Sequence, residues 1–245
     1  MESRVVEAVR GWRWIVEGFA LFRRTPLIWV VLTIVLFAIA FGLGKIPLIG
    51  QFVFYLLSPV FLAGLMIGCR DLERGEELEI GHLVAGFRHN TSQLITLGGV
   101  YLVGQVLIFG VLLLIGGAAL MEAFNAGPKA DPQVIMNSLG PITFALLVAF
   151  SLSVPLMMAI WFAPLLVVFD SVPPVAALKA SFLACLKNML PFLVYGAALV
   201  LLAFIAAIPF GLGFLVLFPT IFGSLYASYK DVFRGEAVKM IEGVA

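Results

Sequence analysis

The stretch SPVFLAGLMIGCRDLERGE, residues 58–76, returns in part as FPTIFGSLYASYKDVFRGE at residues 218–236. The two stretches align without a gap, and both end on the same charged sequence, Asp-x-x-Arg-Gly-Glu. Each copy closes a long run of apolar residues. A repeated exit from an apolar run predicts two copies of one membrane-spanning helix, with both charged ends on the same side of the membrane.

The matched positions carry residue types with specific roles in membrane helices. Small residues four positions apart let two helices approach closely, and proline bends a spanning helix or frees a carbonyl group. An Asp and an Arg three positions apart are neighbours on a helix, and the glycine that follows suits a helix C-terminus with positive φ. The matched pairs are Pro59 with Pro219, Gly64 with Ser224, Gly68 with Ser228, Asp71 with Asp231, Arg74 with Arg234, and Gly75 with Gly235.

The charged sequence has two interpretations. In the first, it ends a helix, forms a local ion pair and anchors the chain at the membrane surface. In the second, the two copies form a paired site that binds an anionic ligand or partner, to which Arg70 and Lys230 add positive charge. The small residues likewise suit packing within one chain or between two chains.

The composition places the chain in a membrane. Hydrophobic residues make up 62% and charged residues 12%, whereas an ordinary soluble domain has about 25% charged residues. The mean hydropathy is +1.13. The net charge of +1, without a basic domain, gives no reason to expect a nucleic-acid partner. Cys69 and Cys185 form neither a disulfide framework nor a metal-ligand pattern.

Six charge-poor runs are long enough to cross about 30 Å of hydrocarbon. The loops on one side hold only Lys45 and Lys129 among the 15 Lys and Arg residues. The positive-inside rule therefore predicts that both termini face the cytoplasm of a bacterial inner membrane. The runs are residues 26–44, 46–69, 94–121, 141–169, 190–208 and 209–229.

The spans group into three tandem units, residues 1–76, 77–170 and 171–236, followed by a short tail at residues 237–245. Each unit is an interfacial amphipathic segment followed by a transmembrane hairpin. The middle unit keeps Pro164 and Asp170 of the repeated motif. Two spans per unit preserve the topology, so the copies are related by a pseudo-threefold axis along the membrane normal. The predicted fold is an all-α integral membrane protein with one transmembrane domain over residues 1–245.

The amphipathic segments are candidates for membrane contact. In the first, Val5, Val9, Trp12, Val16 and Phe19 follow helical spacing, and in the second Ile80, Leu83, Val84 and Phe87 do so. Aromatic and basic residues together favour the headgroup zone, either as plain anchors or as contacts to anionic lipid. The candidate lipid or partner contacts are Trp12, Trp14, Arg23, Arg24, Arg70, Arg74, Lys230 and Arg234.

Catalytic chemistry has no sequence support. The centres of the spans hold almost no ionisable residue, and Gln51 and Gln105 are their notable polar amides. This disfavours a coupled transporter, which usually needs a carboxylate within the membrane. His82 and His89 are seven apart, which is not the spacing of a metal-binding helix. We therefore expect no catalytic residue, no metal site and no cofactor, and no enzyme.

Three stretches carry a resemblance to a known group of proteins: WRWIVEGFALFRRTPLIW, KIPLIG and the opening stretch SPVFLAGLMIGCRDLERGE. With them the chain resembles uncharacterised six-span inner-membrane proteins of proteobacteria. That group is similar to YciC-like proteins and to the membrane domain of some glycerophosphodiester phosphodiesterases. The resemblance covers most of the chain and is strongest over residues 12–100. It implies no enzymatic activity, because the catalytic domain of the phosphodiesterases is absent from this sequence.

These observations favour a non-enzymatic inner-membrane protein. It would bind lipid or a membrane-protein partner through its interfacial helices and the repeated cytoplasmic ends. One alternative is a small uncoupled transporter or lipid-translocating protein, with a pathway between the hairpins beside the prolines. Another is an assembly factor of a larger membrane complex. The sequence names neither the ligand, the partner nor the oligomeric state.

Overall fold

The computed structural model describes residues 2–47, 49–127 and 132–238. Every regular element within these residues is a helix, as the sequence predicts. The α-helices are α1 (Arg10–Arg24), α2 (Pro26–Gly44), α3 (Ile49–Glu73), α4 (Thr91–Ala126), α5 (Pro132–Trp161), α6 (Ala163–Asp170), α7 (Pro174–Lys187), α8 (Met189–Ala207) and α9 (Phe214–Tyr229). A 3₁₀-helix, η1 (Ile80–Arg88), and a π-helical turn, η3 (Lys230–Arg234), accompany them.

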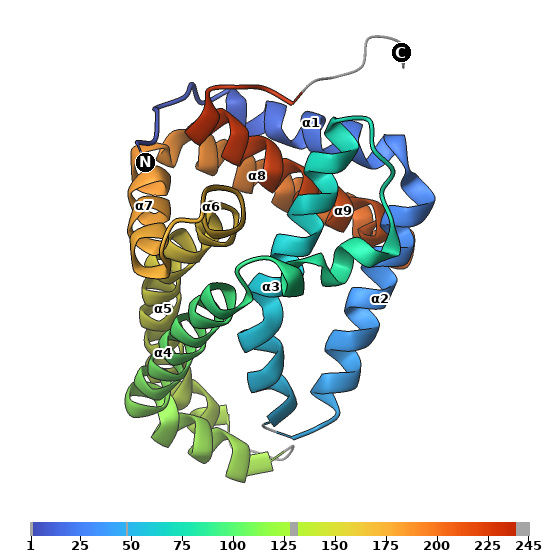
Figure 1. Cartoon of the computed structure of the whole chain (residues 1–245). Helices are drawn as coiled ribbons and strands as arrows, with labels where there is room; N and C mark the ends of the chain where they lie inside the picture. The colour runs from blue at the N-terminus through green and yellow to red at the C-terminus, as the bar shows by residue number, and fades with distance from the viewer. Residues whose placement is uncertain (1, 48, 128–131, 239–245) are drawn as a thin grey trace.

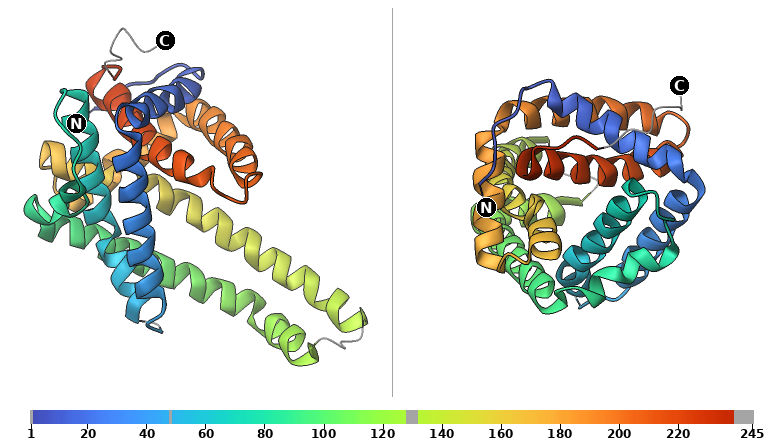
Figure 2. Two further views of the ribbon diagram at one scale, coloured as in Figure 1. Left: turned by 90° about the vertical axis from the view of Figure 1, so that its right-hand side faces the viewer. Right: turned by 45° about the horizontal axis from the view of Figure 1, so that its top comes forward.

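Three helical hairpins, α2–α3, α4–α5 and α8–α9, form the body of the molecule (Figure 1). They lie around a common centre, and α4–α5 extends furthest from α1 (Figure 2). Five helical segments of the described chain have the length and composition of a membrane span: α2, α3, α4, α5 with α6, and α8. The chain is thus an all-α protein with several candidate membrane spans.

The sixth predicted span, residues 209–229, differs from the other five. The chain turns through residues 208–213, where Phe210 and Gly211 have positive φ, so α9 begins only at Phe214. Helix α9 has 16 residues and continues directly into the 5 residues of η3. The prediction of a regular helix over residues 209–229 is therefore wrong for the residues before Phe214.

The three motif prolines act in two ways. Pro59 and Pro219 lie inside α3 and α9 without ending them. The helix breaks just before Pro164: α5 ends at Trp161, and Pro164 lies in the first turn of α6, where a missing N–H is tolerated. Ser181 of α7 replaces part of the lost bonding. Its Oγ accepts from the Phe162 N–H at 2.9 Å and donates to the Met158 carbonyl at 2.7 Å.

Each amphipathic segment packs on the second helix of a hairpin: α1 on α9, η1 on α3, and α7 on α5. A small residue lies at each crossing. A Cβ atom at Gly18 would clash with the Thr220 carbonyl and the Ser224 amide nitrogen, and one at Gly86 would clash with the Val60 carbonyl. At the third crossing Ser181 bonds directly to the backbone of its partner. The short segments are therefore locked to the spans and do not merely lie beside them.

The faces of these segments differ from a simple amphipathic pattern. The predicted stripe of α1, which includes Trp12 and Phe19, is exposed, while the opposite face with Trp14 and Glu17 is buried. Segment η1 is a 3₁₀-helix, in which positions three apart share one face. Leu83 and Gly86 are accordingly buried against α3. The predicted α-helical stripe of residues 80, 83, 84 and 87 is not a packed face.

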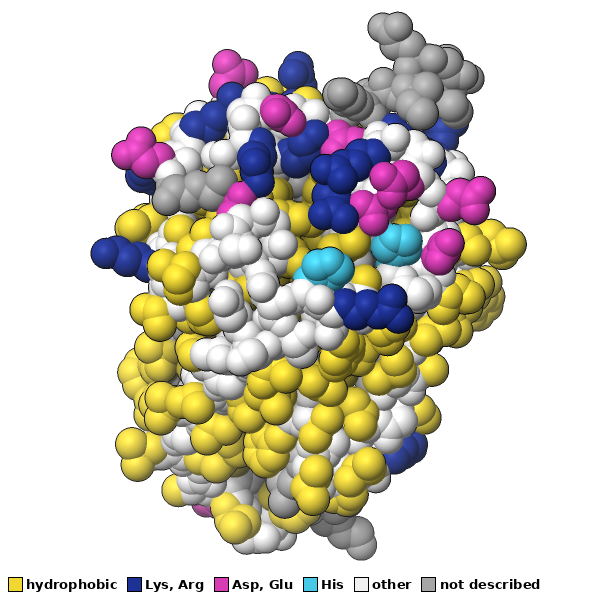
Figure 3. All heavy atoms as spheres, viewed as in Figure 1, with side chains coloured by type: hydrophobic (Ala, Val, Ile, Leu, Met, Phe, Trp, Pro, Cys, Tyr) yellow, Lys and Arg dark blue, Asp and Glu magenta, His cyan; other side chains and the backbone are white. Residues whose placement is uncertain are grey.

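Charged side chains gather at one end of the molecule, in the view of Figure 3 around the region of α1, and the remaining surface is mainly hydrophobic. Many large apolar side chains of α4 and α5 are exposed, among them Phe109, Leu114 and Phe150. Such a surface fits hydrocarbon and not water.

Gly75 and Gly235 have φ of 87° and 71°, which confirms the predicted helix ends. Lys129 and residues 239–245 of the predicted tail lie outside the described residues.

Candidate functional site

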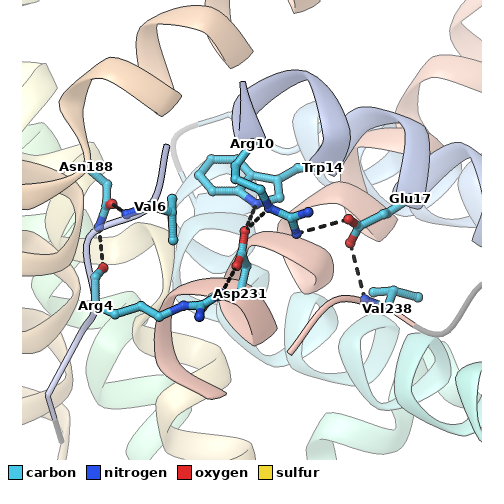
Figure 4. Close-up of polar contacts among 8 residues, drawn as sticks. All are labelled: Arg4, Val6, Arg10, Trp14, Glu17, Asn188, Asp231 and Val238. Atoms are coloured by element: carbon cyan, nitrogen blue, oxygen red, sulfur yellow. Dashed lines mark hydrogen bonds and ion pairs between the residues drawn. The ribbon is translucent and has the colours of Figure 1, made fainter. Parts of the chain in front are cut away.

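Asp231, at the end of α9, accepts hydrogen bonds from three side chains of the N-terminal segment (Figure 4). The Trp14 indole N–H donates to its Oδ2 at 2.8 Å, and the guanidinium groups of Arg4 and Arg10 form ion pairs with its carboxylate. Only 1% of the Asp231 side chain is exposed. These bonds tie residues near the start of the chain to its last helix.

Four further contacts fasten α1 and the segment before it (Figure 4). Arg10 also pairs with Glu17 at 3.0 Å, and the Val238 N–H donates to Glu17 at 3.3 Å. The side-chain amide of Asn188 accepts from the Val6 N–H at 2.8 Å and donates to the Arg4 carbonyl at 3.0 Å. The segment before α1 is therefore held along its length.

The two buried carboxylates respond differently to this environment. Burial alone would raise the pKa of Asp231, but the hydrogen bonds from Trp14, Arg10 and Arg4 outweigh it and hold that pKa below its ordinary value. Burial raises the pKa of Glu17, and the positive charge of Arg10 offsets only part of this rise. Asp231 is thus the firmly ionised member of the cluster.

Asp71, the matched residue on α3, has a smaller set of partners. It accepts from Arg70 Nε at 2.9 Å and lies 3.3 Å from the Nε2 of His82 on η1. His82 precedes Gly86 by four residues, as Trp14 precedes Gly18. Each ring therefore reaches the carboxylate from the segment that crosses its helix. About 13% of the Asp71 side chain remains exposed.

The local ion pairs predicted between Asp71 and Arg74, and between Asp231 and Arg234, do not form. Each Asp bonds to the segment that crosses over its helix. Arg234 pairs instead with Asp170, which also accepts from the Tyr229 hydroxyl. The two halves of the repeated sequence thus serve different contacts.

The basic residues of the two repeated ends line one pocket of about 360 Å³. It lies where α3, α6 and α9 end, and Phe169, Tyr226 and Tyr229 complete its apolar and hydroxyl wall. Two carboxylates, Glu73 and Glu236, also line it. Its cationic side chains are Arg70, Arg74, Lys230 and Arg234, the four cytoplasmic-end candidates of the sequence analysis.

Three of the four cations have protein partners. Lys230 Nζ lies 2.6 Å from Glu73 and 3.5 Å from Glu236. Arg70 lies with its guanidinium carbon 5.5 Å from the Phe169 ring centre, and Arg234 pairs with Asp170. The Arg74 side chain has neither a hydrogen bond nor an ion pair among the described residues. The lining carries four positive and two negative side chains.

The other predicted contact residues lie elsewhere. Trp12 and Arg23 are exposed on α1, and Arg23 lies over the Phe19 ring at 6.0 Å. Arg24 donates to the Leu72 carbonyl at 2.6 Å and so joins α1 to α3. Trp14 has no exposed surface. It is therefore not available to lipid, which corrects the expectation that Trp14 contacts lipid. Its indole N–H instead donates to Asp231 inside the protein.

The small motif residues are used inside the chain. Gly64 lies against the backbone of η1, and Gly68 lies against Leu78 and His82. Ser224 Oγ is 2.7 Å from the Tyr195 hydroxyl of α8. Ser228 Oγ donates to a carbonyl of its own helix. These contacts occupy the faces that dimerisation would need.

Sequence reasoning missed several members of the site. The Tyr226 hydroxyl donates to Glu73 at 2.8 Å, and Tyr229 donates to Asp170, which was predicted only as a motif residue. Arg4 and Arg10 were counted only as charges. No local pattern pairs them with Asp231, since Arg10 and Asp231 are 221 positions apart. Only the helical spacing of Tyr226, Tyr229 and Lys230 signalled a common face.

One curated relative is similar over nearly the whole chain. "Probable inner membrane protein BTH_II0599" of Burkholderia thailandensis is 35% identical over 237 residues, which cover 93% of this chain and 84% of the relative. The chain belongs to the family of this inner-membrane protein. No protein-family model and no solved structure matches the chain. The resemblance to YciC-like proteins and to phosphodiesterase membrane domains thus rests on the quoted residues alone.

Proposed function

We propose that this inner-membrane protein is not an enzyme and binds the phosphate of an anionic lipid headgroup in the charged pocket. The pocket would lie at the cytoplasmic surface, with both termini on that side. Helix α9 would serve as a sixth, partly buried span. The phosphate of a free anion has the same chemistry, and the experiment below separates the two sources.

The charge distribution supports this orientation. Most Lys and Arg side chains in the view of Figure 3 lie at the end around α1. Lys45 lies in the turn after α2. Lys45 lies 4.6 Å from the Phe41 ring centre, a contact typical of a side chain at the membrane boundary. Cytoplasmic loops carry an excess of Lys and Arg, so the charged end would face the cytoplasm.

The crossings support a pseudo-threefold arrangement of units. Gly18 approaches the Thr220 carbonyl and the Ser224 nitrogen, and Gly86 approaches the Val60 carbonyl and the Gly64 nitrogen. These partners are matched positions of the repeat, 160 apart. Ser181 again bonds a carbonyl and an N–H four positions apart. Each amphipathic segment would then pack on the unit before its own, and α1 would close the ring on the third.

One observation carries the functional proposal: Arg74, whose side chain has no partner among the described residues, lines a pocket with three other cations. A planar guanidinium donates two parallel hydrogen bonds to a phosphate. These bonds are strong because both the donor and the acceptor are charged. The C-termini of three helices meet here, and their partial negative charges repel an anion. Part of the positive charge of the cations only offsets this repulsion. We therefore expect binding of moderate strength that weakens with salt.

The test is retention of lipid by the purified full chain in nanodiscs that contain phosphatidylglycerol or phosphatidylcholine. Arg74→Gln should lower the retention of phosphatidylglycerol roughly tenfold, the effect of one lost charge-assisted bond. The matched control is Arg13→Gln, an exposed Arg outside the pocket. Competition by inorganic phosphate would reveal a free-anion site. Equal losses in the two variants would leave only general surface attraction and overturn the proposal.

A lipid-translocating role is a second candidate. It is favoured by an apolar cavity between the three hairpins, whose wall includes Pro59 and Pro164. Gln51 and Gln105 do not line this cavity. An apolar wall suits hydrocarbon better than a hydrophilic solute. Exchange of fluorescent lipid between leaflets of proteoliposomes tests this role, and a rate equal to that of protein-free vesicles would exclude it.

A further inference from the structure

The apolar cavity has a volume of about 420 Å³ and shares no lining residue with the charged pocket. Three segments, residues 58–65, 157–164 and 218–225, each give their first, fourth, fifth and eighth residues to its wall. That spacing is one face of an α-helix. The cavity therefore lies at the centre of the molecule, where one face each of α3, of α5 with α6, and of α9 meet.

The wall chemistry selects a hydrocarbon occupant. The lining residues are aliphatic and aromatic apart from Ser58, and among the aromatic ones Tyr101 and Trp161 carry a polar atom. Ser58 already donates to the Tyr55 carbonyl at 3.0 Å. A buried water needs about two to four polar partners, which this wall does not supply. The volume falls in the range of small-ligand pockets, about 300–1,000 Å³.

A second apolar hollow, about 410 Å³, is lined by residues of α5, α7 and α8. We refer to it as the α5–α8 groove. Met157 and Trp161 line both the groove and the central cavity. A single layer of side chains thus separates the two spaces. Methionine has three rotatable bonds and adapts its shape readily, so this partition can yield to a flexible chain.

Trp161 provides a polar signal at this partition. Its indole Nε1 is buried and has no hydrogen-bond partner within the described residues. Buried donors are nearly always paired, and leaving one unpaired is costly. In a hydrocarbon environment the acceptor must come with the occupant. The carbonyl oxygen of a fatty-acyl ester supplies such an acceptor at the head of an apolar chain.

We propose that the central cavity binds one acyl chain of an ester-linked membrane lipid, which enters through the α5–α8 groove with its ester carbonyl at Trp161. This extends the proposed lipid binding from the headgroup to the chain, at a different site. The cavity does not select headgroup charge, because its wall holds no charged side chain. The chain site is therefore independent of the charged pocket.

The experiment uses the full chain in nanodiscs that contain a phosphatidylcholine with a photoactivatable diazirine in one acyl chain. After irradiation, mass spectrometry maps the modified peptides. We expect modification within residues 58–65, 157–164 and 218–225, in addition to the outer surface near Phe109. Ser58→Phe should reduce the inner modification at least severalfold by filling the cavity, and leave the labelling near Phe109 unchanged. Ile221→Phe fills the same space and replaces Ser58→Phe if that variant does not fold.

Trp161→Phe keeps the ring and removes the donor. We expect a roughly fivefold loss of inner labelling, the effect of one hydrogen bond, with no loss in the control Phe124→Leu on the exposed surface of α4. Labelling confined to the outer surface of the wild-type protein would overturn the chain site. Arg74→Gln should leave the phosphatidylcholine labelling intact. Failure of the headgroup proposal and failure of the chain proposal therefore give different results.

Discussion

The two copies of Asp-x-x-Arg-Gly-Glu, at residues 71–76 and 231–236, differ more in their surroundings than in their sequence. In the second copy three donors from the N-terminal segment bury Asp231, whereas Asp71 has two partners and stays partly exposed. Arg234 is paired with Asp170, whereas Arg74 has no such partner among the described residues. The charged residues of the second copy thus stabilise the structure, whereas the first copy keeps Arg74 available for a ligand.

The difference follows from what covers each helix end. The end of α9 lies under α1 and the segment before it, which bring Arg10 and Arg4 to Asp231. The end of α3 lies beside η1, which brings only His82. A repeated motif therefore acquires different roles from the neighbours that its unit receives, and the motif alone does not determine them.

The largest expected effect separates the two aspartates. Asp231→Asn removes the charge that compensates two arginines, and we expect about 3 kcal/mol of lost stability. This is at the low end for a buried pair because half of Arg4 is exposed. Asp71→Asn should cost about 1 kcal/mol or less. Thermal unfolding in one detergent measures both, and equal losses would contradict the difference in burial.

The pH dependence sharpens the same contrast. The pKa of Asp231 in the folded chain is below its ordinary value. Its contribution to stability is therefore present above the unfolded pKa, about 3.9, and is lost as pH falls through the folded value. The gap between wild type and Asp231→Asn should close below about pH 4. A gap that persists unchanged at lower pH would mean that the charge of Asp231 is not the cause.

The crossing glycines test the similarity of the units. Gly18→Ala and Gly86→Ala should each cost about 1–3 kcal/mol, because the added Cβ meets backbone atoms that cannot move freely. Gly42→Ala is the control, since nothing lies within 4 Å of its Cβ position. The measurement is again thermal unfolding. A large cost at only one crossing would show that the two packings are not the same.

The smallest effect concerns the two arginines. Arg234→Gln should lower stability by up to about 1 kcal/mol through loss of the Asp170 pair, while Arg74→Gln should leave unfolding unchanged. Binding of phosphatidylglycerol should show the reverse order. If Arg74→Gln destabilises the protein as much as Arg234→Gln does, Arg74 holds the structure and is not a ligand contact.

The sequence predicts the helices of this protein better than its contacts. Apolar runs locate α2, α3, α4 and α8, and one run covers most of α5 together with α6, because a chain in hydrocarbon pairs its backbone groups within helices. Gly75 and Gly235 mark the helix ends through their positive φ. The charged partners were mispredicted, since local spacing favours Asp71 with Arg74. Burial beneath a crossing segment decides the pairing instead, and sequence spacing does not encode that crossing.

The candidate site shows the same limit. The four cations of the pocket could be named from the repeat, because the matched ends had to lie on one side. Their convergence around Tyr226 and Tyr229 depends on how three helix ends meet, which no single repeat shows. Trp14 was misjudged because its residue type suits the interface as well as the interior.

The packing of α1 against α9 also has a consequence for how the protein is made. Trp14 and its acceptor Asp231 are 217 positions apart, so the ribosome releases α1 long before α9 exists. Until then the buried face of α1, with Glu17 and Gly18, has no partner. The nascent α1 must wait at the membrane surface while two hairpins insert ahead of its own docking site. The docking of α1, the first helix to be synthesised, is therefore among the last steps in the assembly of this chain.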